Sequence, residues 1–439
     1  MKKILFATLL LMPALVNAQS LFDRVKQKAK ARVDQQVDKG IDRALDGAQG
    51  NAEKAVKTES APNTEAAPES ETEAAAPKAA TPASAQPAFR SYSRYDFVPG
   101  ADIVFAEDFA QDVVGEFPLQ WGTNNRGEAV TIEGFDGKWL RMFKEGKFVS
   151  PAVKSLPANF TMEFDVVLNL PPNTLHSNYP QLDIMLLALE AGADKTRKYL
   201  NGQLYPKADL ELMIAPYPND DSKISIETHE ARELFFSKHG RDLPLLGASV
   251  NKRTHFAFWI QGTRLRLWIN GEKVYDLPQA MPTSAPFTHL AFETHNSPYN
   301  DEQVGYYLSN IRFAQGAPDL RSKFLAEGRF ATSGIQFDAG SDAIKPESAG
   351  VLAEIAALLK ENATLRVKII GHTDSDGEDA KNLTLSKARA AAIKNALSSQ
   401  YGIDAARMDT DGKGEGQPAG PNTTPEGKAK NRRVEFVRL

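Results

Sequence analysis

An acidic residue and an arginine stand fifteen positions apart near the C-terminus, in a context that suits binding of a zwitterion. Asp374 lies in the run 371–377, GHTDSDG, which follows an apolar stretch, and Arg389 lies inside a predicted helix. A carboxylate attracts an ammonium group, and a guanidinium binds a carboxylate through two parallel hydrogen bonds. If the loop and the helix bring the two side chains together, they can hold a molecule that carries both groups.

The same two residues belong to a longer set of motifs. The set comprises Phe337-Asp338, Ser341, Gly371-x-Thr373-Asp374, Gly377, Asn382, Leu385-Ser386, Arg389-Ala390, Gly412-x-Gly414-Glu415, Pro418, Asn422-x-Thr424, Gly427 and Asn431-Arg432-Arg433-Val434-Glu435. These motifs resemble the OmpA-like peptidoglycan-binding domain family over residues 326–439. The resemblance implies that Asp374 binds the ammonium group of diaminopimelate in the cell-wall peptide, and that Arg389 binds a carboxylate of the same group.

Three further site residues follow from this resemblance: Thr373, Asn382 and Gly377. Asn382 and Thr373 are expected to shape the loop and to add hydrogen bonds. Backbone N–H groups around Gly377 and at the start of the next helix are expected to assist an anion. Arg432 and Arg433 are interpreted as mainly structural, securing the last strand and the loop at Asn422.

Two features leave the site open to other interpretations. Asp376 departs from the family pattern, and a second acid beside Asp374 is expected to raise the local pKa or to compete for Arg389. Alternatively, Asp374 and Arg389 simply pair with each other and order the loop, as many surface charge pairs do.

The N-terminus predicts export. Lys2-Lys3 precede the apolar run 4–15, and Val16-Asn17-Ala18 offers a cleavage signal, so residues 1–18 have the layout of a secretory signal peptide. The chain contains no cysteine, which excludes disulfides, cysteine zinc sites and the acylated cysteine of a lipoprotein. The predicted location is the periplasm, attached to peptidoglycan, with peripheral association with the outer membrane left open.

Two segments separate the signal peptide from the first folded domain. Apolar residues recur every three or four positions in residues 19–57, which predicts an amphipathic helix that either associates with a copy or partner, or stays solvated. Residues 58–93 are rich in Ala, Pro and Glu, which predicts a disordered linker.

Residues 94–316 are predicted to form an all-β domain. Alternating apolar residues over Phe160–Leu168 predict a strand with one buried face, and Asn270-Gly271 predicts a hairpin turn. Further strands are predicted at 181–189, 256–260, 264–269, 273–275, 289–294 and 306–313. The runs 264–275 and 305–313, and Glu107-Asp108-Phe109 with Trp121, resemble concanavalin-like and laminin-G-like jelly rolls. The resemblance implies a sandwich of two sheets that binds a glycan or a protein.

Residues 326–439 are predicted to form an α+β domain of the βαβαβ type. A short strand is expected at Ile335-Gln336-Phe337, followed by a helix that Pro346 opens and a strand over 365–369. A second helix is expected over 386–399, ending before Gly402, with later strands at 408–412 and 434–437.

Other candidate chemistry finds little support. Glu163 and Asp165 have the spacing of a glycosidase acid pair, but Val167 replaces the third acid, so solvated acids on an outer face are favoured. The seven histidines have no metal-ligand spacing. Trp259 and Trp268 are expected in the core, whereas Trp121 is the best candidate for stacking on a sugar.

Three functions therefore compete. The favoured one is an exported, non-catalytic envelope protein that binds peptidoglycan and presents the sandwich to a glycan or protein. No catalytic residues, no cofactor and no metal are expected. The alternatives are a wall-anchored glycoside hydrolase and a structural spacer between the wall and an outer-membrane partner. The formal charge of −4 gives no case for nucleic acid.

Overall fold

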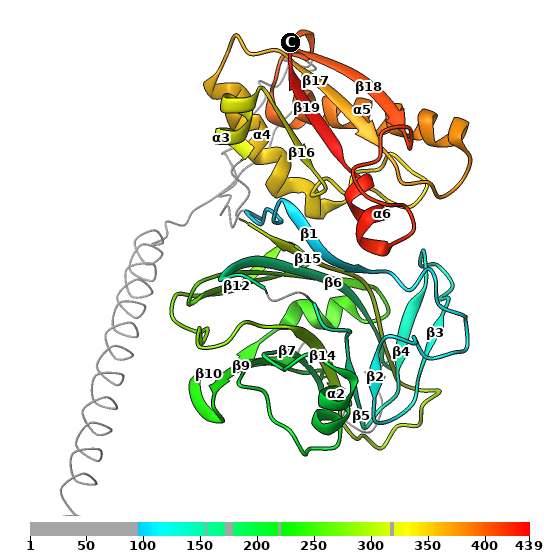
Figure 1. The fold of residues 1–439 in the computed structure, drawn as a ribbon, viewed down its shortest axis with the longest axis vertical. Coiled ribbons are helices and arrows are strands. Elements are labelled where there is room, and N and C mark those ends of the chain that lie inside the picture. The colour runs from blue at the N-terminus through cyan, green and yellow to red at the C-terminus, as the bar shows by residue number, and fades with distance from the viewer. Residues whose placement is uncertain (1–94, 154–155, 172–178, 218–220, 317–319) are drawn as a thin grey trace, which may run out of the picture. The chain divides into compact units, whose positions relative to one another are not determined.

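The computed structural model describes residues 95–439 except 154–155, 172–178, 218–220 and 317–319 (Figure 1). The described residues belong to one compact unit. The predicted signal peptide and the predicted helix over 19–57 lie outside the described residues, as does the predicted linker over 58–93. None of the helices in the described part is both long and apolar enough to span a membrane.

Two antiparallel sheets pack face to face around one large apolar core, and we call residues 102–315 the sandwich. The eight-stranded sheet runs β13-β12-β11-β6-β15-β4-β3, and β1 also pairs with β15. Its strands are β1 Asp102–Glu107, β3 Gly127–Val130, β4 Trp139–Met142, β6 Asn159–Asn169, β11 Arg253–Gln261, β12 Arg264–Ile269, β13 Glu272–Leu277 and β15 Gly305–Gln315.

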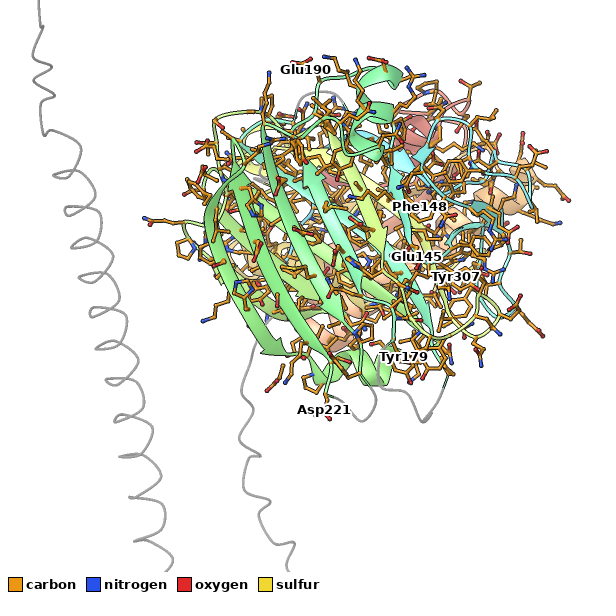
Figure 2. All side chains as sticks on the ribbon, turned by 90° about the horizontal axis from the view of Figure 1, so that it is seen from below. Glu145, Phe148, Tyr179, Glu190, Asp221 and Tyr307 are labelled. Atoms are coloured by element: carbon orange, nitrogen blue, oxygen red, sulfur yellow. The ribbon has the colours of Figure 1, made fainter. Side chains whose placement is uncertain are left out.

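The seven-stranded sheet runs β10-β9-β8-β7-β14-β5-β2, and Figure 2 shows its strands side by side. These strands are β2 Gly122–Thr123, β5 Gly146–Val149, β7 Leu182–Leu187, β8 Ala208–Ala215, β9 Lys223–Glu230, β10 Glu233–Asp242 and β14 His289–Thr294. A short helix, α2 (Ala193–Leu200), and a 3₁₀ turn, η1 (Pro244–Ser249), interrupt them. The strands predicted from the sequence are confirmed, but β1–β5 and β8–β10 were not predicted. The finer likeness to a jelly roll stays a prediction.

Strand β6 corrects one expectation, because both of its faces are buried. Phe160, Phe164 and Leu168 point into the apolar core, as their alternation predicts. Glu163 and Asp165, on the opposite face, are only 3% and 2% exposed. The alternation identified the strand, but it carried no information about what covers the polar face.

The C-terminal domain, residues 320–439, has a four-stranded sheet in the order β16-β19-β17-β18 (Figure 1). Its strands are β16 Arg329–Thr332, β17 Val367–His372, β18 Met408–Gly414 and β19 Val434–Arg438, and only β17 and β18 are parallel to each other. Its helices are α3 Leu320–Glu327, α4 Ala349–Glu361, α5 Asp379–Tyr401 and α6 Pro425–Asn431, with 3₁₀ turns η2 Pro346–Ser348 and η3 Ala405–Arg407.

Two elements predicted in this domain were placed wrongly. The first strand is β16, and the predicted strand at 335–337 contains only an isolated bridge from Phe337 to Ile344. Helix α5 begins at Asp379, seven residues before the predicted start. The apolar core of the domain includes Leu320 of α3. The predicted left-handed cap at Gly402 is confirmed by its φ of 71°.

A short segment before β1 contacts both the sandwich and the C-terminal domain. The Phe97 ring packs on Trp268 of β12 at 5.3 Å between ring centroids, whereas Val98 belongs to the core of the C-terminal domain. A Cβ atom on Gly350 of α4 would lie 2.1 Å from the Phe97 carbonyl oxygen. Glycine is therefore required at position 350 for α4 to approach this segment closely.

Candidate functional site

The loop that carries Asp374 is held between a parallel strand pair and a long helix. β17 ends at His372, and α5 begins at Asp379. A Cβ atom on Gly371 would lie 2.2 Å from the Ser386 carbonyl oxygen, so glycine lets α5 pack directly on the end of β17. Gly377 has a φ of 100°, a conformation that L side chains rarely adopt, and it turns the chain into α5.

Asp374 is buried and forms an ion pair with Arg432. Its Oδ2 atom accepts a hydrogen bond from Arg432 Nη1 at 2.6 Å, and the residue is 7% exposed. Its Oδ1 atom accepts a hydrogen bond from the Asp376 backbone N–H at 3.2 Å, which fixes the carboxylate within the loop. Arg432, expected to be mainly structural, thus also contacts the predicted site through this ion pair.

Asn382 ties the loop together from the first turns of α5. Its Nδ2 group donates to the carbonyl oxygens of Asp374 and Asp376 and to Glu415 Oε2, at 3.3, 3.1 and 2.7 Å. The Thr373 backbone N–H donates to the Gly414 carbonyl, and its buried Oγ1 atom has no hydrogen-bond partner among the described residues. The expected loop-shaping contribution of Asn382 is thus present, and Thr373 offers a free hydroxyl.

Arg389 is held by backbone carbonyls. Its Nε atom donates to the Ser341 carbonyl at 2.9 Å and its Nη2 atom to the Asp338 carbonyl at 3.4 Å, while its guanidinium lies 4.9 Å from the centre of the Phe337 ring. Among the described residues, no carboxylate lies within ion-pair distance of Arg389. Burial lowers the pKa of Arg389, and the negative charge of Asp374 partly offsets this effect. The alternative that Asp374 and Arg389 pair with each other is therefore wrong.

Asp376 does not compete for Arg389 in this structure. Its carboxylate pairs with Lys428 Nζ of α6 at 2.7 Å and is 60% exposed. The Asp374 loop is consequently bounded by two cations of the same C-terminal segment, Lys428 and Arg432. The sequence motifs included Arg432. Its contact with Asp374 arises because α6 folds back toward the loop, which the motifs do not show.

A comparison with protein families identifies this part of the chain. The OmpA family model matches residues 336–432, which span the Asp374 loop, α5 and α6. Residues 336–432 form an OmpA family domain.

Individual relatives cover parts of the chain. The probable lipoprotein YiaD of Escherichia coli is 38% identical over 145 residues, which are 30% of this chain and 64% of the relative. Outer membrane porin F of Pseudomonas aeruginosa is 29% identical over 206 residues, which are 46% of this chain and 55% of the relative. The chain thus spans less than two thirds of the length of both relatives. The crystal structure of the peptidoglycan-associated lipoprotein from Burkholderia pseudomallei shares 30% identity at a TM-score of 0.23, covering 24% of this chain and 88% of that one.

A buried charge network lies where the sandwich meets the OmpA family domain. Arg253 of β11 bridges Asp165 and Glu347, with nitrogen–oxygen distances of 3.1 and 2.7 Å. Arg312 of β15 pairs with Glu163 and also donates to the Ser333 carbonyl. The expectation that Glu163 and Asp165 are solvated acids is therefore wrong.

His255 lies at the centre of this network. Its Nδ1 atom is 2.7 Å from Asp165 Oδ1, and its Nε2 atom is 3.5 Å from Glu163 Oε1. Burial acts to lower the pKa of His255, but the two carboxylates outweigh it and raise that pKa to about 9. Burial likewise acts to raise the pKa of Glu163 and Asp165, but the surrounding cations outweigh it and lower both.

The structure also bears on Trp121 and on a carboxylate–histidine cluster that was not predicted from the sequence. Trp121 is only 6% exposed and packs on Phe109, so the expectation that it stacks on a sugar is wrong.

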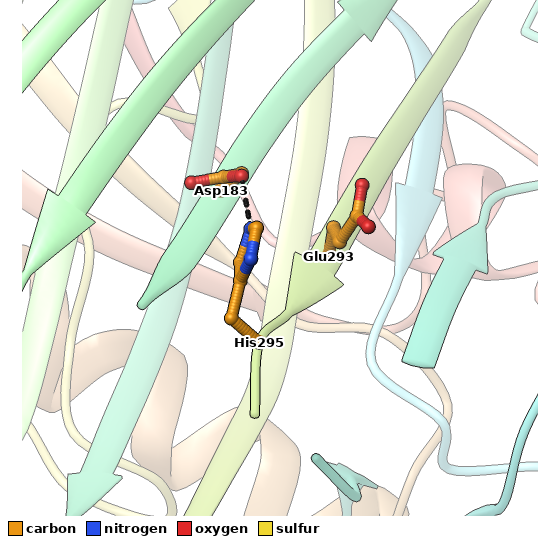
Figure 3. A group of neighbouring side chains, drawn as sticks. All are labelled: Asp183, Glu293 and His295. Atoms are coloured by element: carbon orange, nitrogen blue, oxygen red, sulfur yellow. Dashed lines mark hydrogen bonds and ion pairs between the residues drawn. The ribbon is translucent and has the colours of Figure 1, made fainter. Parts of the chain in front are cut away.

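The side chains of Asp183, Glu293 and His295 form a cluster whose potential metal-ligand atoms all lie within 4.8 Å of one another. Within it, His295 Nε2 lies 2.5 Å from Asp183 Oδ2 (Figure 3). Lys147 pairs with Glu293 at 3.0 Å and supplies positive charge beside the cluster.

Proposed function

We propose that the chain is an exported, non-catalytic cell-envelope protein that binds peptidoglycan non-covalently through its OmpA family domain. In this proposal Asp374 binds the ammonium group of diaminopimelate, and Arg389 binds a carboxylate of the same residue. Thr373, Asn382 and Gly377 shape the loop and supply polar groups. The proposed location is the periplasm, and contact with the outer membrane is left to experiment.

One observation supports this assignment above the others. Arg389 is a partly buried cation whose hydrogen-bond partners are the carbonyls of Ser341 and Asp338, which carry no net charge. Burying a cation without a carboxylate is costly, because the lost hydration is not replaced by an opposite charge. A ligand carboxylate would supply that charge. Asp374, whose pairing with Arg432 leaves its second oxygen bonded only to a backbone N–H, offers the acid for an ammonium group.

The test is co-sedimentation of the full-length mature protein with purified sacculi that contain diaminopimelate. We expect Asp374→Ala and Arg389→Ala each to lower apparent affinity at least tenfold, because each removes one charge that the ligand needs. Asp376→Ala is the matched control for the acid, since that exposed side chain lies in the same loop. Arg366→Ala is the control for the arginine, since Arg366 is 57% exposed and its only ion pair among the described residues, with Asp409, is 4.0 Å long. Unchanged pelleting by both site variants would refute the assignment.

The favoured role for the sandwich is presentation of a surface to a glycan or protein, as its resemblance to concanavalin-like and laminin-G-like folds implies. The glycoside hydrolase alternative is weakened by the network around Glu163 and Asp165. A glycosidase needs one carboxyl group with a raised pKa as its general acid, whereas the pKa of both residues is lowered. A glycan array probed with the full-length protein tests the binding role, and release of reducing ends from polysaccharides tests the hydrolase.

A further inference from the structure

A cavity of about 480 Å³ lies between the sandwich and the OmpA family domain, inside the compact unit that both form. The sandwich contributes Asp108, Ala110 and His255 to its lining, and the OmpA family domain contributes Lys345 and Arg389. Its volume falls within the range of about 300–1,000 Å³ that is usual for small-ligand pockets. The cavity therefore continues from the Arg389 end of the proposed wall-binding site toward the sandwich.

The lining contains both acidic and basic side chains, and its cations include two that are not paired with a carboxylate. Neither Arg389 nor Lys345 has a carboxylate within ion-pair distance among the residues that the structure describes. Arg432 also lines the cavity; its Nη2 atom lies 3.8 Å from Asp108 Oδ2 of the sandwich, which is too long for a hydrogen bond. Arg432 is already paired with Asp374, so Arg389 and Lys345 are the two cations that favour a ligand with carboxylate groups.

Two buried histidines add unsatisfied hydrogen-bonding atoms to the same cavity. His255 is 4% exposed; its Nε2 atom makes no hydrogen bond among the described residues, and its nearest carboxylate oxygen, Glu163 Oε1, is 3.5 Å away. His372 is 2% exposed; its Nδ1 atom lacks a hydrogen-bond partner there as well, and its Nε2 atom lies 3.4 Å from Glu435 Oε1. Buried polar atoms are nearly always bonded in folded proteins, so such atoms facing one cavity indicate where a polar ligand binds.

We infer that this junction cavity is a second binding subsite, formed jointly by the sandwich and the OmpA family domain, for a further carboxylate-bearing residue of the wall peptide. The carboxylate lies toward Lys345 and Arg389, and the peptide amide groups lie toward His255 and His372. This inference rests on the proposed function, because the first residue of the ligand occupies the Asp374 and Arg389 site. It makes the sandwich a contributor to wall recognition rather than a separate module.

The test compares two probes on the full-length mature protein by isothermal titration calorimetry: free diaminopimelate and the stem tripeptide that carries diaminopimelate at its third position. We expect the tripeptide to bind at least tenfold more tightly than free diaminopimelate. Lys345→Gln removes a cation of the subsite. Ala110→Trp fills the cavity from the sandwich at an exposed position without removing a side-chain interaction. Each variant should weaken tripeptide binding about tenfold and change diaminopimelate binding less than twofold.

Matched controls are Lys360→Gln and Ala193→Trp, which change exposed residues of the same types away from the cavity lining. Arg389→Ala should weaken both probes, because that residue belongs to both subsites. Equal affinity of the wild type for the two probes, or tripeptide binding that neither subsite variant changes, would overturn this inference while leaving the proposed function intact. Failure of the wild type to bind either probe would overturn both.

Discussion

Arg432 Nη1 donates a 2.6 Å hydrogen bond to Asp374 Oδ2, and this ion pair joins the end of α6 to the loop after β17. The two residues are fifty-eight positions apart in the sequence. Asp374 is thus held by a cation of its own domain, while Arg389 has its charge free for a ligand. A ligand ammonium group must share the Asp374 carboxylate with Arg432, whereas at Arg389 a ligand carboxylate competes with no carboxylate among the described residues of the protein.

Replacing Arg432 tests whether this shared contact positions the site. Arg432→Ala leaves the Asp374 carboxylate without the cation that orients it, so we expect binding to sacculi to weaken about fivefold, less than in Arg389→Ala. Arg432→Lys keeps the charge and should bind within about twofold of the wild type. Apparent affinities from co-sedimentation across a protein concentration series measure both effects. Wild-type binding by Arg432→Ala would show that the ion pair plays no part in positioning.

Arg253 supplies a test of the junction between the sandwich and the OmpA family domain. Arg253→Ala leaves Asp165 and Glu347 buried without their shared cation, which typically costs about 3–5 kcal/mol of unfolding free energy. Urea denaturation of the mature protein measures the loss. The control is Arg264→Ala, because Arg264 pairs with Asp276 at an exposed position, where such pairs contribute only about 0–1 kcal/mol. A loss no larger than that of the control would contradict a stabilising junction.

The buried histidine predicts how stability depends on pH. His255 has a pKa of about 9 in the folded protein and an ordinary value near 6.5 when unfolded. Between these values the folded state binds more protons, so the contribution of His255 is fully present below pH 6.5 and is lost as the pH rises to 9. The lowered pKa of Asp165 adds stability that is lost as the pH falls below its ordinary value near 4.

Urea unfolding at pH 6 and pH 9 checks this prediction. We expect the wild type to lose on the order of a few kcal/mol between the two values, since one pKa unit corresponds to about 1.4 kcal/mol. His255→Gln cannot titrate and should show a smaller difference between pH 6 and pH 9, from a lower starting stability. His239→Gln, at an exposed histidine of β10, is the control and should behave as the wild type. If the unfolding free energies of the wild type and His255→Gln fell by the same amount between pH 6 and pH 9, His255 would not be the source of the pH dependence.

The parts of the site that depend on local sequence were predictable, and those that depend on distant packing were not. Asp374 lies in the loop after β17 and Arg389 lies in α5, the next helix, so their spacing in the sequence was enough to propose a shared site. Arg432 reaches Asp374 only because α6 returns to the loop, which no spacing encodes. The alternation in β6 identified its apolar face correctly, but the burial of Glu163 and Asp165 depends on what packs against the other face.

The position of Phe97 has a mechanical consequence. The chain enters the described structure at Tyr95 and passes at once between α4 and β12, where Gly350 contacts the Phe97 carbonyl and Trp268 contacts its ring. A pull on the chain ahead of Tyr95 therefore acts first on this segment. The force then reaches the OmpA family domain through Val98, which packs in the core of that domain, and through α4. If that domain is attached to the wall, part of the pull reaches it directly from this segment, through contacts made before the chain enters β1 of the sandwich.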